Sequence, residues 1–150
     1  MRKIGHPVSS VPGLILTMLL LISACGEIRL ISDYDEITDR KISELHQKFA
    51  LHFVQLERMA GTEDANYENF TNFYDEVKVD VRVLRVRAGV IDKNDILIRS
   101  LDLLDSNISD LELLHKTGFR QVDEIVPIRN AFDSSFASMI RFITALKRGR

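Results

Sequence analysis

The sequence predicts an all-α fold, an antiparallel up-down-up-down four-helix bundle over residues 33–150. After position 25 the chain has a single proline and few glycines. Three of those glycines, Gly61, Gly89 and Gly118, follow one another at intervals of 28 and 29 residues. Glycine commonly ends helices because it adopts positive φ without a steric penalty. Apolar residues recur every three or four positions between these glycines, as on a helix face, and short connections favour antiparallel neighbours.

The first helix is expected over residues 33–60. Asp33 is placed to accept hydrogen bonds from free N–H groups at its start. Its apolar face consists of Ile42, Leu45, Phe49, His52, Leu56 and Met59.

The second helix is expected over residues 64–88, with Asp64 at its start. Its core face consists of Phe70, Tyr74, Val77, Val81, Leu84 and Ala88. Residues 77–83 also alternate apolar and polar side chains and are rich in valine, which is typical of a strand. The helical spacing continues through the whole segment, whereas the alternation stops at Leu84, so we favour a helix.

A helical second segment acquires a second apolar row, formed by Val79, Val83, Val86 and Val90. This row lies two positions, or about 200°, from the core face at roughly 100° per residue. A helix that is apolar on two faces is either deeply buried or covered by a partner. The row is therefore our candidate interaction surface.

The third and fourth helices are expected over residues 92–116 and 122–147. Asp92 or Asn94 begins the third, and Pro127 lies in a first turn or marks a kink of the fourth. The apolar face of the third consists of Leu97, Leu101, Leu104, Ile108, Leu111 and His115. That of the fourth consists of Ile125, Ile128, Phe132, Phe136, Met139, Ile143 and Leu146.

Residues 1–24 have the organisation of a secretory leader. Arg2 and Lys3 supply a positive start, residues 13–22 an apolar run, and residues 23–24 two small side chains. Cys25 follows directly and is the one cysteine of the chain. The run Leu-Ile-Ser-Ala-Cys over residues 21–25 resembles the lipobox of bacterial lipoproteins.

This resemblance implies that the signal peptide, residues 1–24, is removed and that Cys25 carries a diacylglycerol and an N-acyl chain such as palmitate. Residues 25–32 are then the lipidated cysteine and a short tether. The next residue is Gly26, whereas an aspartate there retains enterobacterial lipoproteins in the inner membrane. The resemblance thus favours the outer membrane, facing the periplasm.

Two other interpretations of the leader stay open: an ordinary signal-peptide junction with an incidental cysteine, and an uncleaved signal anchor. The apolar run is about ten residues long, whereas a helix needs about 20 to span a hydrocarbon core. We therefore favour a cleaved leader over a spanning helix.

Charge and motifs exclude several functions. Loss of Arg2 and Lys3 with the leader changes the formal net charge from −2 to −4, which argues against nucleic-acid binding. The sequence has no Gly-rich phosphate loop and no glycine elbow around its serines. We expect no enzymatic activity and no resident cofactor apart from the covalent lipid.

A weak metal signal remains. Glu112 and His115 form a Glu-x-x-His pair, whose members share a helix face, and His52 lies in a core position. Dimetal helical bundles need two such pairs with further glutamates, and this chain has one. A histidine near a helix C-terminus is also favoured by the helix dipole, so the metal interpretation is the weaker one.

The chain as a whole resembles small helical envelope lipoproteins that have no assigned activity. We expect a membrane-anchored, non-enzymatic interaction or scaffold module, bound to an envelope protein partner or to itself. The alternative is a bundle that binds a small ligand or a metal around His52, Glu112 and His115.

Overall fold

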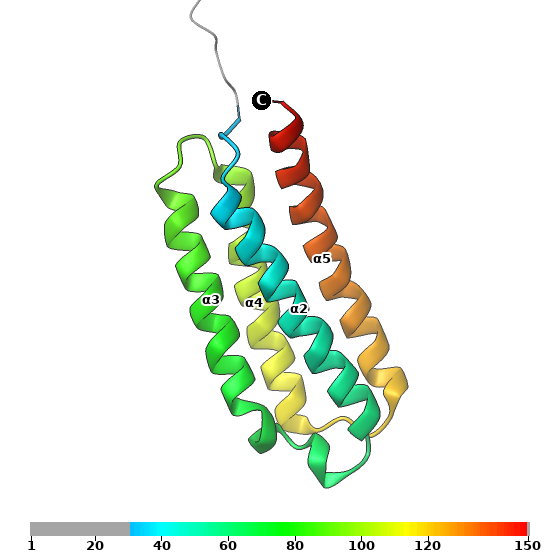
Figure 1. Cartoon of the computed structure of the whole chain (residues 1–150). Coiled ribbons are helices and arrows are strands. Elements are labelled where there is room, and N and C mark those ends of the chain that lie inside the picture. The colour runs from blue at the N-terminus through cyan, green and yellow to red at the C-terminus, as the bar shows by residue number, and fades with distance from the viewer. Residues whose placement is uncertain (1–30, 150) are drawn as a thin grey trace, which may run out of the picture. The chain divides into compact units, whose positions relative to one another are not determined.

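The computed structural model describes residues 31–149, which form four α-helices and two short 3₁₀ turns and contain no strand. The predicted leader, residues 1–24, and Cys25 lie outside the described residues. The helices lie side by side and form one packed unit (Figure 1). They are α2 (Glu36–Met59), α3 (Thr71–Gly89), α4 (Asp95–Thr117) and α5 (Val122–Arg148), with 3₁₀ turns η1 (Glu63–Ala65) and η2 (Tyr67–Phe70) before α3. The predicted all-helical class is confirmed.

The predicted apolar faces form the core of the described unit. Nearly every residue assigned to them is buried, and Met59 and Ile128 are partly buried against the rest. Their burial drives packing because each fully buried Leu, Ile or Phe side chain contributes roughly 1.5–3 kcal/mol. The helix–helix contacts are most extensive between α2 and α5 and between α3 and α4, and less so between α4 and α5. Residues 77–83 lie within α3, so the strand alternative is wrong.

The start of α2 differs by two residues from the prediction. Asp35, rather than Asp33, occupies the N-cap, where its carboxylate accepts a hydrogen bond from the Thr38 backbone N–H at 3.2 Å. Asp35 also accepts two hydrogen bonds from Arg87, at 2.5 and 2.8 Å. The sequence pattern did not show whether Asp33 or Asp35 is the N-cap, because an aspartate at either position can cap a helix.

The start of α3 is seven residues later than predicted. Asp64 lies in η1 rather than at the start of an α-helix, and α3 begins at Thr71. The Asn69 side chain donates to the carbonyl oxygens of Glu63 and Asp64, at 3.1 and 3.3 Å. This bonding satisfies carbonyls that a regular α-helix would use, and asparagine favours such local bonds over helix interiors.

The loop before α4 corrects the predicted cap there. Asn94 occupies the N-cap position, but its side chain makes no cap bond and is buried. It donates to the Ala88 carbonyl oxygen at 3.1 Å and accepts from the Ser32 hydroxyl at 3.1 Å. Asn94 thus joins the end of α3 to the segment before α2. Ser32, which we assigned to the tether, is buried in this contact.

Two of the three predicted glycine stops use positive φ. Gly61 has φ +78° and Gly118 has φ +86°, whereas Gly89 does not, and Lys93 takes the left-handed conformation in that loop. The Gly61 N–H donates to the Phe119 carbonyl oxygen at 3.1 Å, which joins the loops after α2 and α4. A Cβ at Gly61 would lie 2.8 Å from the Arg120 carbonyl oxygen.

The start of α5 is held by a capping box in which Gln121 and Glu124 bond each other's backbone N–H groups. Pro127 lies inside α5, one turn further along than a first-turn position. Because proline has no N–H, its position leaves the Asp123 carbonyl without the usual helical bond.

Candidate functional site

The second apolar row of α3 is exposed. We call Val79, Val83, Val86 and Val90 the valine surface; their exposed fractions are 57, 59, 66 and 80 %. The first three lie on α3, and Val90 follows its last residue in an αR conformation. The opposite face of the helix is buried in the core. The structure thus brings the predicted interaction residues together on one surface.

The valine surface differs from the other exposed apolar side chains in its continuity. Its members follow one another at intervals of four, three and four residues. In the rest of residues 31–149, no helix has four exposed large apolar side chains at consecutive intervals of three or four. Scattered apolar residues are normal on protein surfaces, whereas a contiguous patch marks an interaction site.

The exposed apolar side chains in the C-terminal half of α2 show the contrast. Leu51 and Val54 form a pair, and no further exposed apolar residue lies three or four positions away from either of them. Val54 is 56 % exposed, almost the same fraction as Val79. It therefore provides a matched reference position outside the valine surface.

Charged side chains flank the valine surface on both sides. On the side of α2, Asp80 pairs with Lys48 at 2.8 Å, and Arg87 pairs with Asp35. On the side of α4, Lys78 pairs with Glu112. An apolar centre with a charged rim is the usual composition of a protein–protein interface.

Hydrogen bonds favour the charged forms of Asp35, Arg87 and Lys48. The hydrogen bond from Arg87 holds the pKa of Asp35 well below its usual range, and Asp35 in turn raises the pKa of Arg87. The hydrogen bond to Asp80 raises the pKa of Lys48. Arg82, beside Val83, is exposed and has no ion-pair partner among residues 31–149.

The predicted metal residues divide into two groups. His52 and His115 come together inside the unit, with ring centroids 5.9 Å apart. Glu112 instead accepts hydrogen bonds from Lys78, from the Tyr67 hydroxyl at 2.7 Å, and from Lys116 at 2.9 Å. These hydrogen bonds, of which the one from Lys78 has the largest effect, lower the pKa of Glu112 to about 2. Residues 31–149 contain no group of three or more His, Cys, Asp or Glu arranged to hold a metal ion.

His115 is fully hydrogen-bonded. Its Nε2 lies 2.7 Å from the Ala65 carbonyl oxygen, which can only accept, so Nε2 carries the proton. Its Nδ1 then accepts from the Tyr74 hydroxyl at 2.8 Å. Burial lowers the pKa of His115, so the neutral form that this bonding needs is favoured.

His52 is buried without such bonds. It is 1 % exposed, its ring stacks on Phe73 with centroids 3.7 Å apart, and neither ring nitrogen has a hydrogen-bond partner among the described residues. Burial, and secondarily His115, lower the pKa of His52 to about 3. His52 is therefore neutral in the folded protein at ordinary pH.

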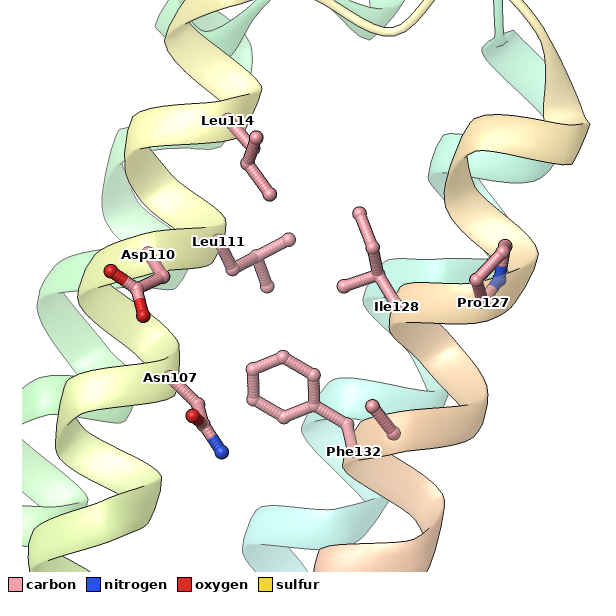
Figure 2. Close-up of a pocket in the computed structure, with 8 residues that line it drawn as sticks. Asn107, Asp110, Leu111, Leu114, Pro127, Ile128 and Phe132 are labelled. Atoms are coloured by element: carbon pink, nitrogen blue, oxygen red, sulfur yellow. The ribbon is translucent and has the colours of Figure 1, made fainter.

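A hollow between α4 and α5 was missed by the sequence reasoning. It has a volume of about 320 Å³, and Leu111, Ile128 and Phe132 point toward one another across it (Figure 2). A second hollow of about 250 Å³ lies along the same two helices, beside Leu103 and Ser135. The α5 side of the second hollow is lined mainly by Ser134, Ser135 and Ser138, and that of the first includes Ala131 beside the larger Ile128 and Phe132. The sequence signal was this run of small residues, Ala131, Ser134, Ser135 and Ser138.

Comparison with known proteins gives no relative: no family model, no curated protein and no solved structure matches this chain. Within residues 31–149, none of the helices is both long and apolar enough to cross a bilayer.

Proposed function

We propose that this chain is a lipid-anchored protein of the bacterial cell envelope whose helical unit is a non-enzymatic interaction module. The observation that carries the proposal is the valine surface, a continuous apolar row on the outer side of α3. Covering it removes apolar area from water, which is favourable by roughly 25 cal/mol per Å². The row therefore supports a protein partner.

The anchor in this proposal is Cys25. The lipobox resemblance supports attachment of a diacylglycerol and an N-acyl chain there, and two or more acyl chains suffice for stable membrane attachment. With Gly26 next in the chain, the proposed location is the outer membrane, facing the periplasm. The anchor would hold the valine surface close to the membrane.

We further propose that the four helices run antiparallel, up-down-up-down. Contacts between opposite ends of neighbouring helices support this. Asp35, before α2, pairs with Arg87 in the last turn of α3. Glu57, near the end of α2, pairs with Arg129, in the N-terminal third of α5, at 2.6 Å. Tyr74, near the start of α3, bonds His115 in the last turn of α4.

A small-ligand or metal-binding role around His52 and His115 is the second candidate. The observation in its favour is the buried His52 ring, whose nitrogens have no partner among residues 31–149. Elemental analysis and absorbance of protein purified from its native membranes would test this role. A bound metal or chromophore that is lost in His115→Ala supports it, and a metal-free, colourless product that His115→Ala leaves unchanged removes it.

The interaction role is tested by photo-crosslinking in cells of the native host. A photoreactive amino acid at Val83 should give a discrete protein adduct, whereas the same amino acid at Val54 should give none. Equal adducts at the two positions, or none from any position of the valine surface, would contradict the proposal.

The anchor is tested separately by metabolic labelling. Labelled palmitate should enter the wild-type chain and be absent from Cys25→Ala, which should accumulate as precursor or leave the membrane fraction. Continued labelling of Cys25→Ala would remove the lipid anchor from the proposal without affecting the valine surface.

A further inference from the structure

The valine surface has the spacing of a coiled-coil seam. Its intervals of four, three and four residues are those of alternating d and a positions in a heptad repeat. Val79 and Val86 take d positions, and Val83 and Val90 take a positions. This spacing suits an approaching α-helix better than a loop or a strand, because only a helix presents side chains at the same interval.

The charges beside the seam discriminate between possible partner helices. The e positions, directly after each d position, are Asp80 and Arg87, and the g positions, directly before each a position, are Arg82 and Gly89. One heptad earlier, Asp75 takes a g position and is exposed. The pattern can therefore be compared with that of a second copy of α3 in either direction.

A parallel, in-register second copy is disfavoured. Parallel coiled coils place each g residue beside the e residue five positions later on the partner helix. That rule sets Asp75 against Asp80 and Arg82 against Arg87, so every pair has like charges, and symmetry repeats each pair.

An antiparallel second copy is favoured by the same residues. When Val83 packs on Val86 of the other copy, and Val79 on its Val90, facing e positions set Asp80 against Arg87. The two-fold symmetry of this arrangement forms the Asp80–Arg87 pair twice. Both side chains already bond neighbours on α2 or before it, so each new pair would extend an existing ion pair.

Arg82 fits the antiparallel arrangement as well. Its g position faces Gly89 of the other copy, at the C-terminal end of that α3. A Cβ added at Gly89 would have nothing within 4 Å, so the space beside it is open. The carbonyl groups at a helix C-terminus attract a cation, which gives Arg82 a partner that it lacks within its own described residues.

We propose that the valine surface binds the valine surface of a second copy of this chain, with the two α3 helices antiparallel. This inference rests on the proposed function and names the partner. Such a contact has two-fold symmetry, with the same patch on both subunits. The apolar row is short, so the dimer is weak in solution, and membrane attachment raises the effective concentration of the copies.

Cysteine crosslinking of the full chain in its native membranes tests the direction of pairing. Val79→Cys and Val90→Cys are made as single variants and co-expressed with different tags, and the wild-type chain, with Cys25 alone, gives the background. In the antiparallel dimer position 79 lies beside position 90 of the other copy. Two copies of position 79 are then about 16 Å apart at 1.5 Å per residue, beyond the reach of a disulfide.

Oxidation should therefore join Val79→Cys to Val90→Cys and leave each single variant unjoined to itself. Crosslinks of position 79 to itself and of position 90 to itself would overturn the proposal in favour of parallel pairing. Adducts of Val83 to a different protein, with no crosslink between copies, would overturn self-association and leave the proposed function intact. If neither crosslinks between copies nor adducts to a different protein form, both self-association and the proposed interaction role are contradicted.

A matched pair of substitutions measures the strength of self-association. Val83→Lys should abolish the crosslink between positions 79 and 90, whereas Val54→Lys should leave it unchanged. Circular dichroism and thermal unfolding of both variants show whether each remains folded. A folded Val83→Lys variant that keeps the crosslink would overturn the proposal.

Discussion

The carboxylate of Asp35 does two things at once: it caps α2 and binds the guanidinium of Arg87 at the end of α3. The Thr38 N–H donates to one carboxylate oxygen, and Arg87 donates to both, at 2.5 and 2.8 Å. Asp35 and Arg87 are 52 positions apart in the sequence. One side chain thereby joins the start of one helix to the last turn of another, beside the valine surface.

Asp35→Ala should therefore destabilise the fold in two ways. Loss of the cap costs about 1 kcal/mol, and loss of the partly exposed ion pair up to about 1 kcal/mol more. Asp35→Asn is the matched control, because asparagine caps as well as aspartate but carries no charge. In chemical denaturation, the free energy of unfolding of Asp35→Asn should lie between those of the wild type and Asp35→Ala. Equal stability of Asn and Ala would show that the ion pair, not the cap, matters.

Acid should remove the contribution of Asp35. Its folded-state pKa is below the ordinary 3.8, so its stabilisation is present above that pH and is lost as pH falls below it. Unfolding free energies of wild type and Asp35→Asn should converge in this range. Curves that stay parallel down to low pH would contradict the assignment.

The buried His52 predicts a second pH dependence of stability, which begins at less acidic pH. Its pKa falls from 6.5 to about 3 on folding, so the protein is destabilised as pH drops from 6.5 toward 3. The slope approaches about 1.4 kcal/mol per pH unit. His52→Phe keeps an aromatic ring on Phe73 and should flatten this slope. The measurement is unfolding free energy at about pH 7, 6 and 5, a range that spans the onset of the effect.

At neutral pH, His52→Phe should leave stability unchanged or raise it. A buried N–H without a partner costs about 1–3 kcal/mol, and phenylalanine removes it. A large loss of stability at neutral pH would show that the His52 nitrogens have a partner that residues 31–149 do not supply.

Three glycines should respond differently to alanine. Gly61→Ala should be the most damaging, because it combines positive φ with a Cβ 2.8 Å from the Arg120 carbonyl oxygen. Gly118→Ala meets only the backbone strain, about 1–2 kcal/mol. Gly89→Ala should stabilise by up to about 1 kcal/mol, since Gly89 is helical with open space beside it. Thermal unfolding gives the order, and any other order contradicts it.

The hollow between α4 and α5 offers a gain in stability. Ala131→Leu places apolar atoms beside Ile128 and Phe132 and should stabilise by about 0.5–2 kcal/mol, as cavity-filling changes do. Ala145→Leu, an exposed position of α5 outside both hollows, should change stability little. Equal effects of the two substitutions would show that the gain comes from helix propensity or surface contacts instead.

The sequence predicted much of the fold and less of the site. Helical periodicity is a local property, so it identified most core residues of all four helices and the outward row of Val79, Val83, Val86 and Val90. It missed Phe53 of α2, which is 1 % exposed. Loop chemistry was harder to predict. Asp64 and Asn94 both have the residue type of a helix cap, yet one lies in a 3₁₀ turn and the other is buried and bonds the end of α3.

The metal candidates show the same limit. Glu112 and His115 share a face of α4 at i and i+3, which the sequence reveals. It does not reveal that Lys78 and Tyr67 bind the carboxylate, or that Ala65 and Tyr74 bind the imidazole. Those partners come from other elements, so no spacing within α4 encodes them.

The sequence by itself determined that this chain has four amphipathic helices and a second apolar row on one of them, because periodicity depends on neighbours a few residues away. The resemblance of residues 21–25 to a lipobox is the only support for a lipid anchor at Cys25, which lies outside the described residues. Only the tertiary structure decided that the valine row stays uncovered and that Asp80 and Arg87 stand beside it, each held by a residue before or on α2. The physical reason is that exposure and ion pairing depend on which helices pack together. Asp80 and Arg87 bond partners that are more than 30 positions away in the sequence, so no local pattern encodes these contacts.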